Sequence, residues 1–343
     1  MKTYIHNYYA AFHCIADRCR HSCCKGWEIM IDDTALSLYH DLKGELGEKL
    51  RRNITENEDG ASFRLDAEER CPFLQADGLC ELICKGGEAL LCDICALHPR
   101  YFNELPSRDE CGLGFSCEEA CRVILSSEAP MVLIPSEEPD ELSDEGFDEG
   151  FDEGFDEDPD EDPGETLTEA AETDPEEQEF LFLRQAVLSL VQDRALSFDQ
   201  RLLLLQERYM LPPAPSFARA AALLLPLEHL EADWACDLEA LSMLRDADPA
   251  PLQPFDNAFE QFMSGLIYRH FRRVFDGEDL RSVLAFVVFS VQAVRLLSLL
   301  TARRQGALTF EDLCDLVRRY SSEIEYSDEN VDRLIDALSE ELP

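Results

Sequence analysis

The chain has little positive charge for its length. Its 343 residues include 30 Lys and Arg against 72 Asp and Glu, which gives a formal net charge of −42. Proteins that follow nucleic-acid phosphates need basic surfaces. The composition therefore argues against nucleic-acid binding and suits a partner whose surface is basic.

Three features that mark other protein classes are also missing. The first thirteen residues contain no apolar h-region of the kind found in export signals. The most apolar run, Ser282–Leu300, holds Gln292 and Arg295, so we expect a buried helix and no membrane insertion. There is no Gly-rich strand-to-helix turn, so the common Rossmann site for S-adenosylmethionine has no sequence support. A cytoplasmic location is expected.

Cysteine, in contrast, is plentiful and unevenly placed. Twelve of the 14 cysteines lie between Cys14 and Cys121. The other two, Cys236 and Cys314, are expected to be ordinary buried core residues. Without an export signal the thiols should stay reduced, so metal binding is favoured over a disulfide framework.

Acidic residues cluster just after the cysteines. From Glu137 to Glu179 the chain has no Lys or Arg, and Asp-Glu-Gly-Phe repeats in tandem over 144–155. Self-repelling charge and glycine cannot offset the entropy lost on ordering. We predict a flexible linker over 136–175, and the alternative is an acidic segment that docks a basic partner through its repeated phenylalanines.

Helical patterns follow the linker. Ser197 with Gln200, and Thr309 with Asp312, resemble capping boxes before apolar runs. The run from Leu280 onward is apolar on most sides, which predicts the central helix of a bundle.

These patterns together predict a mainly α fold in three parts. The parts are an irregular cysteine-rich metal-binding domain of short helices and loops (1–135), an acidic disordered linker (136–175) and a C-terminal helical bundle (176–343).

The spacing of the cysteines favours an iron–sulfur cluster. Soft thiolates bind zinc, copper(I) and iron–sulfur clusters. Structural zinc sites often use two C-x2-C pairs, and only one pair, Cys92 with Cys95, is present. Clusters accept cysteines from several loops, so zinc is kept as the alternative metal. On a helical turn Cys19 and Cys23 would share a face and Cys24 would point away.

The order of these motifs resembles the flagellin lysine-N-methylase family. The matching segments in the first third are 9–14, Cys19, 23–27, 29–32, 71–74, 77–80, Cys95, 98–100 and 115–122. In the second half they are 268–271, 275–277 and the apolar helix up to Leu297. Glu118 departs from the pattern, since a proline is usual there.

The resemblance implies a 4Fe–4S cluster, S-adenosylmethionine as methyl donor, and flagellin lysine Nε as acceptor. The cysteines that match the family are Cys14, Cys19, Cys23, Cys24, Cys71, Cys80, Cys95 and Cys117. Eight exceed the needs of one cluster, so four ligands are not singled out. Cysteines additional to the pattern, which leave a second metal site open, are Cys84, Cys92, Cys111 and Cys121.

Methyl transfer from a sulfonium donor suggests further residues. Aromatic walls favour a sulfonium cation, and Trp27 and Tyr101 lie near the cysteine motifs, although core packing is the alternative for Trp27. Arg100 could bind a donor carboxylate in bidentate fashion, and an ion pair with a neighbouring acid is its alternative. No catalytic residue is assigned.

Metal ligation is also conceivable for three histidines among the thiols, although hydrogen-bonded structural roles are expected. They are His13, His21 and His98.

The sequence therefore predicts an iron–sulfur lysine methyltransferase. A non-catalytic zinc- or iron-chelating protein with a helical partner-binding domain is the alternative, and an electron-transfer enzyme is a weaker one.

Overall fold

A computed structural model describes residues 2–57, 60–136 and 174–343 of the chain. The tandem Asp-Glu-Gly-Phe repeat and nearly all of the predicted linker lie outside these residues. The linker, and the division of the chain at its two ends, stay predictions.

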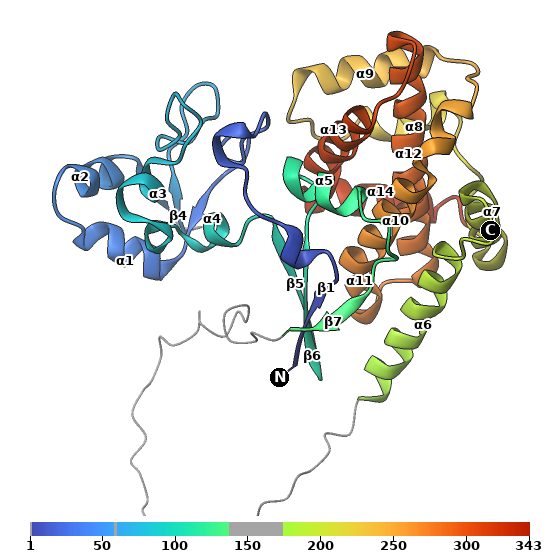
Figure 1. The fold of residues 1–343 in the computed structure, drawn as a ribbon, viewed down its shortest axis with the longest axis horizontal. Helices are drawn as coiled ribbons and strands as arrows, with labels where there is room; N and C mark the ends of the chain where they lie inside the picture. Colours follow the sequence, from blue (N-terminus) through green and yellow to red (C-terminus); the bar gives the residue numbers. More distant parts are fainter. Residues whose placement is uncertain (1, 58–59, 137–173) are drawn as a thin grey trace, which may run out of the picture.

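A four-stranded sheet lies between a small lobe and the helical part of the molecule (Figure 1). Its strand order is β5-β6-β1-β7. The bounds are β1 Lys2–His6, β5 Arg100–Leu105, β6 Arg108–Leu113 and β7 Leu133–Pro135. Strand β1 runs parallel to β6 and antiparallel to β7, while β5 and β6 form a hairpin. The N-terminal strand thus joins segments that are a hundred residues away.

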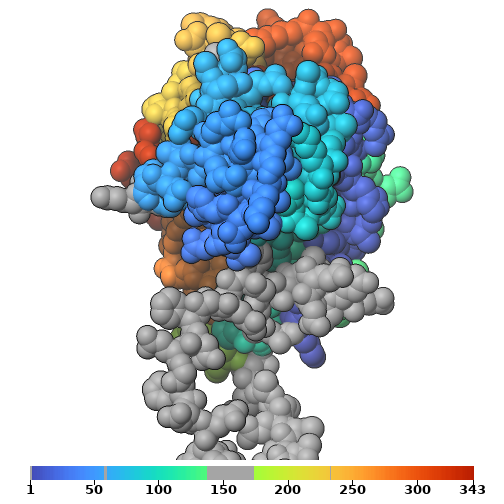
Figure 2. All heavy atoms as spheres, turned by 90° about the vertical axis from the view of Figure 1, so that its left-hand side faces the viewer, coloured from blue at the N-terminus to red at the C-terminus, as the bar shows by residue number. Residues whose placement is uncertain are grey.

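The small lobe has its own sheet and its own apolar core. The sheet order is β2-β4-β3. Its elements are β2 Met30–Ile31, α1 Asp33–Asp41, α2 Glu45–Arg52, β3 Ile54–Asn57, β4 Gly60–Phe63, α3 Glu81–Gly86 and α4 Asp93–Leu97. The core runs from Ile29 to Cys92 and includes the fully buried Tyr39 and Phe73. Viewed end-on, this lobe covers the face turned toward the reader in Figure 2.

Helices make up the rest, as the sequence predicts. They are α6 Pro175–Val191, α7 Phe198–Tyr209, α8 Phe217–Leu224, α9 Ala232–Met243, α10 Asp256–His270, α11 Arg272–Phe275, α12 Leu280–Gln305, α13 Phe310–Tyr320 and α14 Asp328–Ser339. Both predicted capping boxes are present, at Ser197 and Thr309. Each satisfies backbone N–H groups that the first helical turn leaves without a partner.

Helix α12 is the central helix of this bundle, as predicted. It alone among the described helices has the length and apolar character to cross a membrane, but 89% of its most apolar window is buried inside the fold. Because neighbouring helices cover α12 on all sides, its apolar residues on every face are buried.

One helix of the cysteine-rich region packs into the C-terminal bundle. Helix α5 (Glu118–Leu125) lies against α10 and α13 in Figure 1. Its Ala120, Cys121 and Ile124 have no exposed surface and belong to the large core of the helical part. The cysteine distribution separates the first 121 residues from the rest of the chain. The apolar cores place the boundary earlier, because residues 100–125 share their core with the bundle.

The strands are the main departure from the expected irregular N-terminal region. They are two to six residues long, and β6 has the sequence Arg-Asp-Glu-Cys-Gly-Leu. The charged residues of β6 hide the alternation of apolar and polar residues that marks a strand. A charged residue in a strand normally lies on the face exposed to solvent, but Glu110 is buried. Arg184 on α6 explains that burial, donating from both terminal nitrogens to Glu110 at 2.6 and 2.5 Å.

Breaking this ion pair should destabilise the fold strongly. Glu110→Gln would leave Arg184 buried and without its counter-charge, and such losses typically lower the free energy of unfolding by about 3–5 kcal/mol. Urea unfolding followed by circular dichroism measures the change. Glu179→Gln, at an exposed position on the same helix as Arg184, is the control, and equal stability of the two variants would contradict the prediction.

Candidate functional site

Five cysteines gather in the small lobe and are called the inner set: Cys24, Cys71, Cys80, Cys92 and Cys95. All five belong to, or pack against, the small lobe's apolar core. The backbone brings them together. The Cys71 N–H donates to the Cys24 carbonyl at 2.9 Å, and the Cys95 N–H donates to the Cys92 carbonyl at 2.9 Å. Cys80 and Cys92 precede the first turns of α3 and α4.

Four other cysteines lie where the small lobe meets the helical part, and they are called the outer set: Cys14, Cys19, Cys23 and Cys117. Cys117 is the residue before α5 and packs against the large core. The Cys19 thiol donates to Glu118 at 3.7 Å, which brings it beside Cys117. Cys14 and Cys23 are exposed. The outer set therefore spans the two halves of the molecule.

The pKa values of the thiols follow the same grouping. Burial, with a smaller contribution from Cys19 and Cys14, raises the pKa of Cys117 to about 11. Burial, with smaller contributions from Cys24, Cys80 and Cys92, raises the pKa of Cys71 to about 12.

Cys23 and Cys24 connect the two sets. A hydrogen bond from Cys23 lowers the pKa of Cys24, against the effect of burial. A lowered pKa favours the thiolate, which is the form that binds metals.

The donor atoms suit a soft metal or cluster in kind, since each set holds at least four thiols. Their arrangement does not yet form a ligand shell, because no three His, Cys, Asp or Glu side chains in the described ranges are placed to hold a metal ion. Metal binding by the eight predicted cysteines therefore stays a prediction.

The expected helical face for Cys19 and Cys23 is wrong. The only helical turn nearby is the 3-10 turn Ala16–Arg18, and both cysteines lie beyond it. The core prediction for the two outlying cysteines holds for Cys314, which is buried, and is wrong for Cys236, which is exposed.

Of the four additional cysteines, three are fully buried core residues: Cys92, Cys111 and Cys121. Cys121 is fully buried, and its thiol donates to the Phe115 carbonyl at 3.1 Å. Cys111 is fully buried, and its thiol lies 3.6 Å from the Tyr9 hydroxyl. Cys92 belongs to the inner set, and Cys84 is exposed one turn after Cys80.

Next to the cysteines lies a chain of ring and cation contacts that we call the junction cluster: Trp27, His98, Tyr326, Arg269 and Tyr101. The Trp27 and His98 ring centres are 6.0 Å apart, and those of His98 and Tyr326 are 6.5 Å apart. The Arg269 guanidinium lies 4.4 Å from the Tyr326 ring centre and 5.6 Å from that of Tyr101. The Trp27 indole N–H donates to the Cys23 carbonyl at 2.7 Å. The cluster therefore leads from the cysteines into the helical part.

A buried carboxylate lies behind Arg269. Glu325 is 3.9 Å from Arg269 Nε and 3.2 Å from His270 Nε2. Burial alone would raise the pKa of Glu325, but the hydrogen bond from His270 and the charge of Arg269 outweigh it, so the pKa is lowered. Glu325 ends a π-helical turn, Ser321–Glu325, and such turns are frequent at functional sites.

The three predicted donor-binding residues have different surroundings. Tyr101 lies under Arg269, and its hydroxyl is 3.3 Å from His6 Nε2. Trp27 is half-buried and takes part in the junction cluster rather than in an apolar core alone. The Arg100 Nε donates to the Tyr9 hydroxyl at 2.5 Å, and none of the described residues forms an acidic ion pair with it. Binding of a donor by these residues stays a prediction.

The three histidines considered as metal ligands also differ in their surroundings. His21 pairs with Asp315 at 2.8 Å, His13 is exposed, and only His98 joins the junction cluster. The Nε2 atom of His98 is buried and has no hydrogen-bond partner. Burial, and then the charges of Arg100 and Arg269, lower the pKa of His98 to about 4. His98 is therefore neutral at pH 7.

Buried histidines should make the fold sensitive to acid. Burial and then Arg184 lower the pKa of His6 to about 3, below the ordinary 6.5. Between those two values the unfolded chain binds more protons than the folded chain, so stability falls as the pH drops below 6.5. Each such histidine contributes a slope of about 1.4 kcal/mol per pH unit.

His6→Phe keeps a ring in place and should flatten this slope between pH 6.5 and 4.5. Urea unfolding at several pH values measures it, with His13→Phe as the exposed control. Parallel stability curves for wild type and His6→Phe would show that His6 is not buried in its neutral form.

The contributions from the helical part were missed by sequence reasoning. The segment 268–271 matches the family, but the sequence gives Arg269 no role. No sequence pattern indicates Glu325 or Tyr326 as site residues. Their positions depend on the π-helical turn after α13, and no periodic sequence pattern predicts such a turn.

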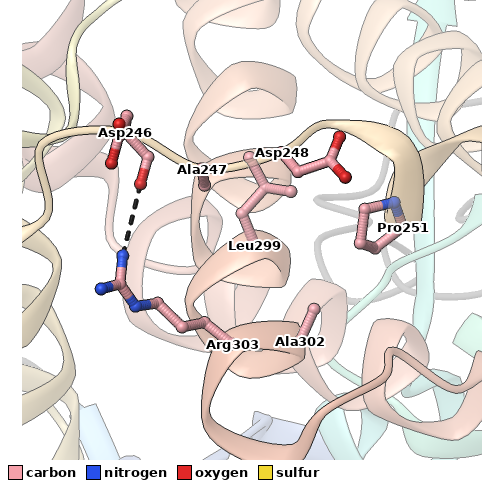
Figure 3. Close-up of a pocket in the computed structure, with 7 residues that line it drawn as sticks. All are labelled: Asp246, Ala247, Asp248, Pro251, Leu299, Ala302 and Arg303. Atoms are coloured by element: carbon pink, nitrogen blue, oxygen red, sulfur yellow. Dashed lines mark hydrogen bonds between the residues drawn. The ribbon is translucent and has the colours of Figure 1, made fainter.

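A separate hollow of about 550 Å³ lies at the C-terminal end of α12 (Figure 3). Its seven lining residues are Asp246, Ala247, Asp248, Pro251, Leu299, Ala302 and Arg303. The Arg303 guanidinium donates to the Asp246 carbonyl at 3.4 Å across one side of it. No cysteine or aromatic ring lines this hollow. The junction cluster is therefore the better candidate for the functional site.

Comparison with known proteins finds a likeness in the last third of the chain to a domain of lysine N-methylases. Residues 227–342 match the family described as FliB lysine N-methylase C-terminal domain. The predicted resemblance to lysine N-methylases is thus confirmed over this segment, and the matched residues include Arg269, Glu325 and Tyr326. No solved structure matches the chain.

Two curated relatives illustrate the match. The chain is 27% identical over 128 residues to the "Lysine-N-methylase" of Salmonella typhimurium strain LT2, covering 36% of this chain and 32% of that protein. It is 28% identical over 128 residues to the "Flagellar biosynthetic protein FliU" of Salmonella muenchen, covering 76% of that protein. The match thus spans about a third of the length of the Salmonella typhimurium relative.

Proposed function

We propose that this protein methylates the Nε atom of flagellin lysines, with S-adenosylmethionine as donor and an iron–sulfur cluster held by its cysteines. The observation that carries the proposal is the junction cluster. There, Arg269 and Tyr326 of the lysine N-methylase C-terminal domain meet His98 and Trp27 of the cysteine-rich region.

Methyl transfer requires a neutral amine, and the surroundings of His98 disfavour a protonated nitrogen. Deprotonating a lysine of pKa about 10.4 at pH 7 costs roughly 4.6 kcal/mol. His98 reports on the environment, because a fall of its pKa from 6.5 to about 4 corresponds to about 3 kcal/mol against the protonated form. The same burial and the same two guanidinium groups would lower the pKa of an incoming lysine.

The aromatic faces and Arg269 suit the donor. A sulfonium is favoured over aromatic rings, and Tyr326 and Trp27 offer two faces. Arg269 is better placed than Arg100 for the donor carboxylate, because Arg100 is already bound to Tyr9. Tyr326 is 40% exposed, so the side chain of a protein substrate has access.

The step itself is then a displacement. The lysine nitrogen forms a bond to the methyl carbon while the carbon–sulfur bond of the donor breaks, and sulfur keeps the electron pair. The lysine proton leaves to solvent before this step. A bound cluster with one iron atom free of cysteine would supply a Lewis acid for the donor's polar groups, and three of the cysteines in the two sets would hold it.

The proposal is tested with anaerobically purified full chain, flagellin and methyl-labelled S-adenosylmethionine. Label on lysine Nε, located by mass spectrometry, is the expected result. Flagellin whose lysines have been acetylated is the control and should stay unlabelled. Metal-containing protein that transfers no methyl group to flagellin would overturn the proposal and favour the non-catalytic chelating protein.

A further inference from the structure

We infer that His98 binds the lysine that is methylated: its Nε2 atom accepts a hydrogen bond from the neutral amine and holds the nitrogen lone pair toward the methyl donor. The inference deepens the proposed function and rests on it, because it names the residue that orients the acceptor amine. It gives a role to a histidine that the sequence offered only as a metal ligand or a structural residue.

The His98 ring is held between two aromatic rings that come from different parts of the molecule. Its centre lies 6.0 Å from that of Trp27 and 6.5 Å from that of Tyr326. The backbone just after it is anchored too, because the Gly114 N–H donates to the Pro99 carbonyl at 2.7 Å. The proposed function gives the same two rings to the sulfonium, so a group bound at His98 lies next to the methyl donor.

The Nε2 atom of His98 has no partner within the fold. It is buried and makes no hydrogen bond. Buried polar atoms in folded proteins are nearly always paired, so each exception calls for an explanation. A ligand that donates to Nε2 when it binds supplies that explanation.

Arg269 offers the complementary hydrogen-bonding group. Its Nη1 atom is also buried and without a hydrogen-bond partner, and its guanidinium lies 4.4 Å from the Tyr326 ring centre. A guanidinium can only donate, so it needs an acceptor such as the donor carboxylate, whereas a neutral imidazole nitrogen can accept. His98 and Arg269 thus offer opposite groups around the ring of Tyr326, one for each reactant.

The charges near His98 decide between orienting the amine and taking its proton. Arg100 and Arg269 both add positive charge, and with burial they lower the pKa of His98 to about 4. The ring therefore stays neutral and keeps a lone pair on one nitrogen, but it is too weak a base to hold the proton of a lysine ammonium. His98 orients an amine that has already lost its proton to solvent.

This arrangement leaves the reacting electron pair free. The hydrogen bond to Nε2 uses an N–H of the amine, so the nitrogen lone pair stays available. That lone pair forms the bond to the methyl carbon while the carbon–sulfur bond breaks and sulfur keeps its electrons. Fixing the direction of the lone pair lowers the barrier because the reacting atoms start in the productive geometry.

The first test compares the kinetics of His98→Leu and His98→Gln with those of the wild-type full chain, using flagellin and methyl-labelled S-adenosylmethionine. His98→Leu should lower kcat about 10- to 100-fold, as expected for a misplaced reacting group. The KM for S-adenosylmethionine should not change, because other residues hold the donor. His98→Gln should restore most of the rate, since its amide oxygen can accept a hydrogen bond.

His40→Leu is the matched control, because His40 is exposed on α1, and it should behave as wild type. An unchanged kcat in His98→Leu would overturn the inference. A raised KM for the methyl donor, or equal losses in the leucine and glutamine variants, would overturn it as well.

A second measurement needs no leucine variant, so it holds if that variant fails to fold. The wild-type protein is labelled with the heavy nitrogen isotope in histidine, and the Nε2 resonance of His98 is assigned by its absence from His98→Gln. With S-adenosylhomocysteine present, Nα-acetyl-lysine amide should shift this resonance. Nα-acetyl-norleucine amide, which lacks the amine, should leave it in place, and an equal response to the two probes would overturn the inference.

The two proposals can fail separately. Methylation of flagellin with no change at His98 would overturn the inference and leave the proposed function standing. A shifted His98 resonance in protein that transfers no methyl group would overturn the proposed function and leave the amine-binding role of His98 standing.

Discussion

Replacing Arg269 with lysine is expected to raise the KM for S-adenosylmethionine about 10- to 100-fold, with a smaller effect on the fold. Lysine keeps the charge opposite Glu325 but loses the planar fork that binds a carboxylate with two parallel hydrogen bonds. Hydrogen bonds to charged groups contribute about 1.5–3 kcal/mol, which corresponds to that range of affinity.

Initial rates at varied donor concentration measure this effect. Arg272→Lys is the matched control, since Arg272 lies three residues further on and its guanidinium donates to the Glu104 carbonyl, away from the junction cluster. An unchanged donor KM in Arg269→Lys, with Arg100→Lys raising it instead, would return the donor carboxylate to the arginine that the sequence first indicated.

Sequence reasoning recovers the helical part well because its signals are local. The capping boxes at Ser197 and Thr309 and the long apolar run of α12 are each determined by residues within one helix. The small strands depend on distant partners. β1 pairs with β6 a hundred residues away, and the buried Glu110 is tolerated only because Arg184 reaches it from another segment.

The candidate site shows the same division. The cysteines stand out in the sequence because of their number and spacing. Their separation into two sets does not, because it depends on which core each segment packs against. Arg269, Glu325 and Tyr326 are ordinary residues of a helical domain until α5 and the hairpin of β5 and β6 bring the cysteine-rich region against them.

The second large effect is expected at Gly114, where the two halves of the site touch. A Cβ atom there would lie 2.3 Å from the Tyr326 hydroxyl, 2.9 Å from Arg269 Nη1 and 3.3 Å from the Pro99 carbonyl. Gly114→Ala should therefore push Tyr326 and Arg269 away from His98. A displacement of about 1 Å in positioning groups can lower turnover about 100-fold, and the methyl-transfer rate with flagellin measures it.

Gly265→Ala separates this positioning effect from a general loss of stability. Gly265 lies on α10, and a Cβ atom there would come within 2.5 Å of the Phe115 ring, deep in the core. Overpacking costs about 1–3 kcal/mol, partly offset by the better helix propensity of alanine. Both variants should lose stability in urea, while only Gly114→Ala loses turnover beyond its unfolded fraction. Equal activity losses in the two variants would mean that the contact of Tyr326 and Arg269 with Gly114 serves the packing of the fold alone.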